Sequence, residues 1–302
     1  MTTRTGLVLG GGGVTGIAWE VGLLAGLRDG GADVGGADLV VGTSAGSAVG
    51  AVLATGEDLD HLYAEQTTPP DEAGGASFGT REAVTLLGLM MLPGSGRTKR
   101  RRIGHVARKA HPGPADEQVA VFAERLRRPD GSLPSWPERD LKITSVQAET
   151  GSFTVFDRDG EADLVHAVAA SCAVPLVWPA VEIGGHHYVD GGMRSAANAD
   201  LAAGCDVVLA VVPLWRSLGR YHSLPEQLRR TGARRTAWIS PDQDSLQAIG
   251  KNVLDPAMRV GAARAGRAQG RRMASEVADG WPRGSVVEPP RGTSGVSRPS
   301  ER

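Results

Sequence analysis

The sequence has few cysteines, few aromatic residues and almost no net charge. Its two cysteines, Cys172 and Cys205, cannot form a disulfide framework and suit a reducing compartment. A formal net charge of −1 over 302 residues excludes a global electrostatic preference for nucleic acid or for a membrane surface. No apolar run approaches the roughly 18 residues of a membrane span, and the N-terminus lacks the pattern of a signal peptide. These absences predict a cytoplasmic globular protein.

Acidic residues are missing from one long segment, between Glu82 and Asp116. Two interpretations of this segment stay open: a solvated surface insertion at about 93–115, or an interfacial lid in which an apolar helix at 83–92 enters a bilayer beside anionic lipid. Nucleic-acid binding is disfavoured because no aromatic residues interleave with the cations. The cations concerned are Arg97, Lys99, Arg100, Arg101, Arg102, Arg108 and Lys109.

Glycine, by contrast, is abundant, and four glycines stand together in LGGGGVTGIAWE, residues 9–20. Consecutive glycines are costly to order, so this position requires a backbone without Cβ atoms. The stretch contains the G-x-G-x-x-G pattern of dinucleotide-binding proteins. That class also needs an acidic residue at the carboxyl end of the next strand, whereas Asp33 and Asp38 precede the apolar residues 39–41. The nucleotide interpretation is therefore disfavoured.

The order of predicted elements indicates an α/β fold. A strand, helix, strand, helix order at the start argues for a parallel sheet with helices on its faces. Two long Arg- and Ala-rich helical patterns follow Pro213, and 289–302 has the composition of a disordered tail. Predicted strands lie at 5–10, 37–42, 140–150, 151–160, 181–192 (as a hairpin arm) and 206–214, and predicted helices at 16–28, 44–56, 57–67, 81–92 and 161–174.

The pentapeptide GTSAG, residues 42–46, directly follows a predicted strand and opens a predicted helix. This is the context of a nucleophile elbow, where Gly42 and Gly46 allow a sharp turn that exposes the hydroxyl of Ser44. The alternative is an ordinary Gly- and Ser-rich helix cap. If Ser44 is a nucleophile, the N-terminal glycine loop leaves the sheet at the same edge and can supply N–H donors to an oxyanion.

A third segment, YVDGG, places Asp190 after a strand-like run and before Gly191 and Gly192. A carboxylate on such a loop can approach Ser44 directly, and the alternative is a plain turn aspartate. None of the seven histidines occupies the usual place of an α/β-hydrolase histidine, late in the chain after an acidic partner.

Taken together and in this order, GGGVTG, GTSAG and DGG resemble the signature of the patatin-like phospholipases, over about residues 5–214. The resemblance implies an α/β/α sandwich with a central, mostly parallel sheet, and a serine acyl hydrolase with a Ser–Asp dyad in place of a triad. It makes Ser44 the nucleophile and Asp190 the general base. It also assigns an oxyanion hole to Gly11, Gly12 and Gly13, in which Gly12 and Gly13 are the main donors and Gly11 shapes the turn, with support from Gly16, Gly42, Gly46, Gly191 and Gly192.

Two positions depart from the family pattern. Many members carry an acidic residue where this chain has Gly10, and the family usually has Arg or Lys where this chain has Thr15. Thr15 removes a cation that could order the oxyanion loop or meet a lipid head group. A catalytically weak or silent lipid-binding protein is therefore the alternative to a phospholipase, lysophospholipase or esterase.

The remaining expectations concern organisation and partners. We expect one hydrolase domain at 1–288, no metal or cofactor, an acyl lipid substrate and no nucleic acid, with peripheral contact to an anionic membrane and the oligomeric state left open. Trp19 and Trp178 are candidates either for an acyl-pocket wall or for the core. Both cysteines are expected to be packing residues.

Overall fold

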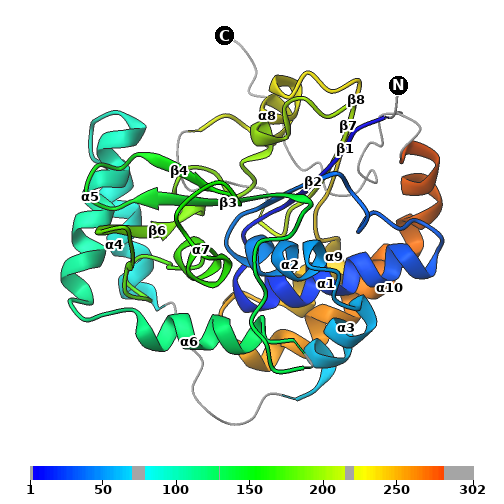
Figure 1. The fold of residues 1–302 in the computed structure, drawn as a ribbon, viewed down its shortest axis with the longest axis horizontal. Coiled ribbons are helices and arrows are strands. Elements are labelled where there is room, and N and C mark those ends of the chain that lie inside the picture. The colour runs from blue at the N-terminus through cyan, green and yellow to red at the C-terminus, as the bar shows by residue number, and fades with distance from the viewer. Residues whose placement is uncertain (1–2, 70–78, 129, 215–220, 282–302) are drawn as a thin grey trace.

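The computed structural model describes residues 3–69, 79–128, 130–214 and 221–281 (Figure 1). These residues contain an eight-stranded sheet in the order β5-β6-β3-β2-β1-β7-β8, and β4 pairs with β3. Strands β3, β2, β1, β7 and β8 run parallel, whereas β4, β5 and β6 pair in antiparallel fashion. The strands are β1 (Thr5–Leu9), β2 (Leu39–Gly42), β3 (Asp140–Gln147), β4 (Phe153–Phe156), β5 (Val181–Ile183), β6 (His186–Asp190), β7 (Val207–Val211) and β8 (Arg235–Ile239).

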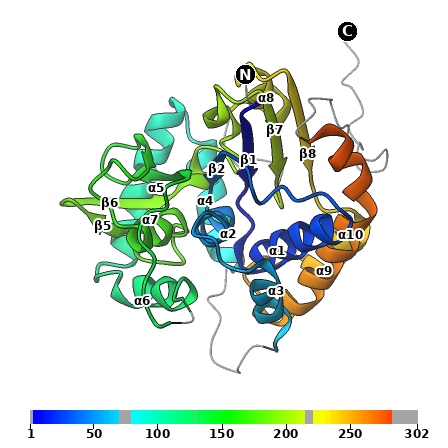
Figure 2. The ribbon, with the colours of Figure 1, turned by 45° about the vertical axis from the view of Figure 1, so that its right-hand side comes forward.

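Helices cover both faces of the sheet, which confirms the predicted three-layer α/β/α sandwich. Helices α1, α2, α7 and α10 lie on one face, with α1 and α10 side by side (Figure 2). Helix α8 covers the other face at β1, β2 and β7, and α4 and α5 cover it at β3 and β6. The helices are α1 (Gly13–Asp29), α2 (Ala45–Ala54), α3 (Leu59–Thr67), α4 (Thr80–Met91), α5 (Gly96–Ala110), α6 (Asp116–Arg125), α7 (Leu164–Ser171), α8 (Leu224–Arg230), α9 (Gln243–Ile249) and α10 (Arg259–Gly280).

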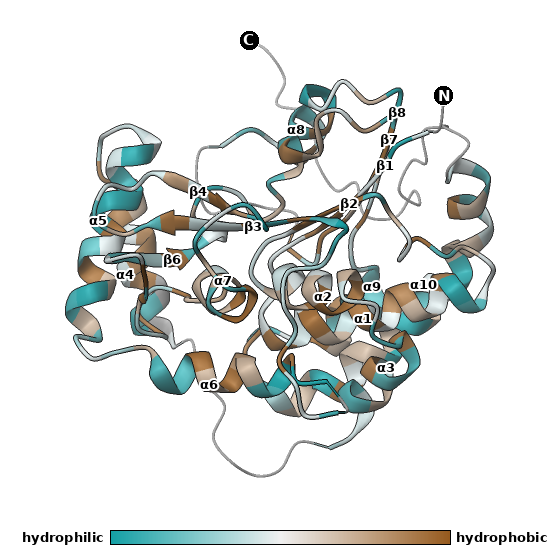
Figure 3. Cartoon of the chain, viewed as in Figure 1, coloured by the Kyte–Doolittle hydropathy of each residue, from teal (hydrophilic) through white to brown (hydrophobic). Residues whose placement is uncertain are grey.

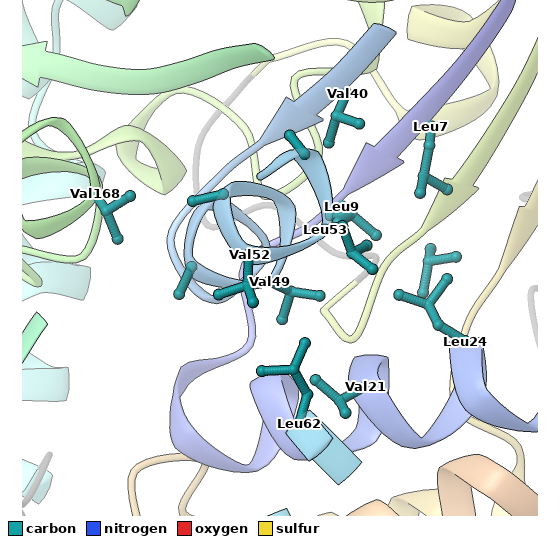
Figure 4. Close-up of a cluster of buried hydrophobic side chains, with 14 of the residues drawn as sticks. Leu7, Leu9, Val21, Leu24, Val40, Val49, Val52, Leu53, Leu62 and Val168 are labelled. Carbon is teal, nitrogen blue, oxygen red and sulfur yellow. The ribbon is translucent and has the colours of Figure 1, made fainter. Parts of the chain in front are cut away.

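The core forms on both sides because successive side chains of a strand point to opposite faces. In β1, Leu7 and Leu9 join the cluster with α1 and α2, while Val8 joins the cluster with α8. The close-up in Figure 4 shows Leu9 and Val40 directed toward α2, above the side chains of α1. Hydrophilic residues concentrate on outer helices such as α3 and α5 (Figure 3). Among the described residues, no helix is both long and apolar enough to cross a bilayer.

The register of β3 brings two of the predicted loops together. Ile143 pairs with Gly42 of β2 on one side and with Phe156 of β4 on the other. Two residues further on, Ser145 pairs with Asp190 of β6, while β4 still occupies the opposite side. Strands β2 and β6 therefore follow one another along the same edge of β3, and the ends of both strands meet there.

The structure corrects the prediction for the region after Pro213. Two long helices were expected, but the described residues fold into two short helices, α8 and α9, the edge strand β8 and one long helix, α10. The missed strand, RTAWI, has only partly buried side chains at three of its five positions, so its apolar signal is weak. The tail expected at 289–302 lies outside the described residues.

The basic segment also has more structure than a solvated insertion. Residues Gly96–Ala110 form α5, whose Ile103 and Ala107 are buried against β3 and β6. The guanidinium groups of Arg97 and Arg100 donate to the carbonyl oxygens of Thr150 and Gly151, at 3.2 and 2.9 Å. Part of the cationic run therefore fastens the β3–β4 turn.

Candidate active site

Ser44 occupies a strained turn between β2 and α2. Its φ of 51° and ψ of −118° are uncommon for a residue with a side chain. The first turn of α2 packs directly against β1, since a Cβ on Gly46 would lie 2.2 Å from the carbonyl oxygen of Leu9. This close packing leaves the turn no room to relax. Such a strained strand-to-helix turn is the geometry of a nucleophile elbow.

Three side chains hold the backbone of Ser44 in this conformation. Ser171 Oγ, at the end of α7, accepts a hydrogen bond from the Ser44 N–H at 2.9 Å. Ser47 Oγ and Cys172 Sγ both donate to the Ser44 carbonyl oxygen, at 2.7 and 3.2 Å. Burial and the neighbouring Asp190 raise the pKa of Cys172 to about 12, so this thiol is a neutral donor. Sequence reasoning identified Cys172 only as a packing residue and missed Ser171.

Asp190 ends β6 and is buried beside Ser44. The Ser44 side chain is near enough to lower the pKa of this carboxyl group, and the Gly192 N–H donates to its Oδ1 at 2.7 Å. Burial raises the pKa of Asp190 to about 6, although Ser44 and the Gly192 N–H oppose the increase. A carboxylate with this pKa is ionised at neutral pH yet basic enough to share the serine proton.

The loop after Asp190 is locked to the residue that precedes Ser44. Asn198 has a left-handed φ of 52°, and its Nδ2 donates to Thr43 Oγ1 at 3.0 Å and to the Ser195 carbonyl at 2.8 Å. Arg194 donates to Asn198 Oδ1 at 2.7 Å. The sequence offered only a weak signal for Asn198, a residue type that tolerates left-handed backbone, at the end of the stretch that begins with Asp190.

The N-terminal glycine loop lies next to Ser44. A Cβ on Gly11 would contact the Ser44 Cβ at 3.5 Å, and the Gly11 N–H donates to the Ala196 carbonyl at 2.8 Å. The N–H groups of Gly12 and Gly13 have no acceptor within the described residues. Gly13 has a φ of +63°, and its Cβ would lie 2.7 Å from the Val253 carbonyl, so glycine is required there.

Two buried residues, Thr15 and Glu20, fix the position of this loop through hydrogen bonds. Thr15 is fully buried, and both its N–H and its hydroxyl donate to the carbonyl of Val253, at 3.0 and 3.3 Å. Glu20 is also fully buried and accepts a hydrogen bond from the Gly10 N–H at 3.0 Å. Burial holds the pKa of Glu20 well above its ordinary value, against the smaller effect of the Gly10 N–H. Neither contact was predicted.

A cavity of about 840 Å³ opens onto Ser44 and Gly13. This volume lies within the usual range for small-molecule sites. Four of its side chains, Val21, Val49, Val52 and Leu62, belong to the core cluster of Figure 4. Trp178 lines the cavity, whereas Trp19 is a core residue that donates to Gln269 at 3.1 Å. The further lining residues are Val14, Ile17, Ala45, Ala48, Glu65, Gln66, Thr68, Pro69, Val121, Phe122, Glu124, Arg125, Leu126, Cys172, Val174, Leu254, Pro256 and Arg259.

No histidine of the described residues lines this cavity. His187, on the strand that leads to Asp190, hydrogen-bonds Glu149 at 2.8 Å instead. Among all the residues that the structure describes, no three His, Cys, Asp or Glu side chains are arranged to hold a metal ion. The groups gathered around Ser44 are thus the buried carboxyl group of Asp190 and the backbone N–H groups of the glycine loop.

A strained serine and a buried aspartate at one edge of an α/β/α sandwich define a candidate serine hydrolase site. A family model described as patatin-like phospholipase matches residues 7–203. The chain belongs to the patatin-like phospholipase family, which supports lipid hydrolysis as its class of activity. A comparison with curated proteins finds no match.

Several solved structures resemble the chain at low sequence identity. VipD from Legionella pneumophila is 14% identical with a TM-score of 0.45, over 91% of this chain and 67% of VipD. The type III effector ExoU is 15% identical with a TM-score of 0.39, over 91% of this chain and 54% of ExoU. In the complex of SpcU and ExoU from Pseudomonas aeruginosa, the matched chain is 16% identical with a TM-score of 0.38, and 53% of it is covered. The chain thus spans about half the length of the ExoU chains.

Proposed function

We propose that this protein is a serine acyl hydrolase that cleaves carboxylic esters of acyl lipids, with Ser44 as nucleophile and Asp190 as general base. The proximity of the Ser44 side chain, which lines the cavity, to the buried Asp190 carboxyl group, whose pKa it lowers, carries the proposal. The strained backbone of Ser44 supports it, since the same strain recurs in nucleophile elbows.

The proposed reaction has two halves. Ser44 Oγ attacks the ester carbonyl carbon while its proton passes to Asp190, and the resulting oxyanion accepts hydrogen bonds from the Gly12 and Gly13 N–H groups. The C–O bond of the ester breaks, and the alcohol leaves with the proton from Asp190. Asp190 then takes a proton from water, whose oxygen attacks the acyl carbon. The fatty acid departs as Ser44 Oγ regains that proton.

The experiment combines a covalent probe with one substitution. A fluorophosphonate should label the wild type, and Ser44→Ala should abolish labelling and lower hydrolysis of a chromogenic ester by at least about 10³-fold. Ser132→Ala, at an exposed loop serine, is the matched control and should keep both properties. Unlabelled, inactive wild type that still binds acyl lipid would instead support the silent lipid-binding alternative.

We also propose that α4 and α5 dock on an anionic membrane. Helix α4 exposes an apolar row in which Val84 is 63%, Leu87 58% and Met91 76% exposed. Helix α5 packs beside α4 and carries the cationic run. An apolar row next to cations is the surface that interfacial helices present to anionic lipid.

A vesicle sedimentation assay tests the docking surface. Leu87→Asp should weaken binding to anionic vesicles by about tenfold or more, because it places a carboxylate in the apolar row. Leu246→Asp alters a leucine of similar exposure, 52%, on α9 and serves as the control. Equal loss in the two variants, or binding that ignores both lipid charge and salt, would exclude this surface.

A further inference from the structure

Two arginines stand at the cavity that opens onto Ser44. Arg125 is in the last turn of α6, and Arg259 begins α10. Among the described residues that line the cavity, the cationic side chains are these two. They come from segments more than a hundred residues apart in the sequence. Two cations are thus assembled from distant segments at the wall of one cavity.

Neither guanidinium group is neutralised by a carboxylate of the described chain. Arg125 stacks over the Phe122 ring at 5.4 Å from its centroid and forms no ion pair there. Arg259 donates from one terminal nitrogen to the Thr68 carbonyl at 2.6 Å, while its buried Nε has no acceptor. A buried donor without a partner is unfavourable, and the acceptor of a ligand would satisfy it.

The acidic residues of the cavity are engaged elsewhere. Glu65 pairs with His61 at 3.4 Å, and Glu124 pairs with Arg127 at 2.9 Å. The two guanidinium groups are close enough that the charge of Arg259 lowers the pKa of Arg125, in addition to the larger effect of lost solvation. Two like charges held together without counter-charges form a site for an anion.

The position of Arg125 relates this site to the reacting end of the cavity. The charge of Arg125 lowers the pKa of Cys172, the residue that donates to the Ser44 carbonyl, although burial dominates that pKa. Arg125 therefore lies near Cys172, and both residues line the cavity that opens onto Ser44. Thr15 is neutral and buried, so the glycine loop offers no competing cation.

We propose that Arg125 and Arg259 form an anion-binding subsite that holds the phosphate group of an acyl lipid while the acyl chain occupies the apolar part of the cavity. Guanidinium groups suit phosphate because each presents paired N–H donors to its oxygens. This inference rests on the proposed acyl hydrolase function and adds the substrate class: phosphate-bearing lipids in preference to neutral glycerides.

A binding experiment tests the subsite apart from catalysis. The protein carries Ser44→Ala, and the ligands are an ether-linked lysophosphatidate and the matching monoalkylglycerol, which contain no ester and are used below their micelle concentrations. Isothermal titration should give at least tenfold tighter binding of the phosphate ligand. Arg125→Gln and Arg259→Gln should each remove most of that preference, and Arg125→Lys should restore part of it. Arg264→Gln, which removes an exposed cation of α10 outside the cavity, should leave it intact.

Other outcomes separate the two proposals and the source of the anion. Equal affinity for the two ether lipids, or a preference that survives both glutamine substitutions in folded protein, overturns the subsite. Inorganic phosphate that binds as tightly as the lysophosphatidate overturns the lipid assignment. A preserved preference in a wild type that hydrolyses no ester would uphold the subsite and refute the hydrolase. In active protein, the kcat/KM ratio of lysophosphatidate to monoacylglycerol should fall about tenfold in the Arg125→Gln variant.

Discussion

Asp190, the proposed base, combines two properties that are unfavourable together: it is buried, and it must be charged to accept a proton. Ser44 and the Gly192 N–H compensate only part of the lost solvation, so its pKa stays near 6. At this value the carboxylate is ionised in most molecules at neutral pH. Burial of Asp190 therefore makes its carboxylate more basic and lowers the free energy of unfolding at neutral pH. Both effects can be measured.

The first prediction concerns the pH dependence of hydrolysis. Because only ionised Asp190 can accept the serine proton, kcat/KM for a short neutral ester should fall about tenfold per pH unit below pH 6 and level off above pH 7. The measurement is a rate profile between pH 4.5 and 8.5, with circular dichroism to show that the protein stays folded. A flat profile between pH 5 and 7 would contradict this role.

The second prediction concerns stability at the same residue. The folded-state pKa of about 6 lies above the ordinary value of 3.8, so folding is favoured while the group is protonated and loses stability as pH rises from about 4 through 6. Asp190→Asn should match the wild type in urea unfolding near pH 3.5. At pH 7 it should be more stable by up to about 3 kcal/mol, although inactive. Lower stability of the variant at pH 7 would show that the ionised carboxylate stabilises the fold.

Glu20 provides a third prediction, with the same sign. Its raised pKa means that stability is present at low pH and is lost as pH rises toward the folded-state value. Glu20→Gln keeps the shape and the acceptor for the Gly10 N–H. Its urea midpoint should equal that of the wild type near pH 4 and exceed it at pH 9. A midpoint that falls at both pH values would indicate that the second carboxyl oxygen has an essential partner.

Among the elements, α1 and α10 pack unusually closely. A Cβ on Gly266 would lie 2.3 Å from the Trp19 carbonyl, and one on Gly22 would lie 2.0 Å from the Ala263 carbonyl. The two backbones thus approach without side chains between them. This approach fixes the start of α10, and with it Arg259, relative to the helix that follows the glycine loop.

The fourth prediction tests this helix contact. Alanine is a better helix former than glycine by about 1 kcal/mol, yet Gly266→Ala should destabilise the protein by about 1–3 kcal/mol, because the new methyl group overlaps backbone atoms. Gly261→Ala is the control in the same helix, since its Cβ would meet nothing closer than 3.9 Å, and it should stabilise slightly. Urea unfolding of both variants distinguishes close packing from helix propensity.

Over the whole molecule, sequence reasoning predicted the features that are encoded locally. The strand, loop and helix around Ser44 follow from residues adjacent in sequence, and so does the turn at Asp190. Ser171 and Asn198, which position these two residues, could not be predicted because their roles depend on contacts across the fold. Helix α5 was missed because two of its cations, Arg97 and Arg100, are satisfied by carbonyl groups of a distant turn. The assignment of the dyad itself stays a prediction.

The contact between Thr15 and Val253 joins positions 238 residues apart, beyond the span that the family model matches. A ribosome makes Ser44 and Asp190 well before it makes the segment that holds the glycine loop. A nascent or prematurely terminated chain would carry both side chains without this support for the glycine loop. Under the proposed function, synthesis order would thus delay the competence of the site until Val253 has emerged from the ribosome.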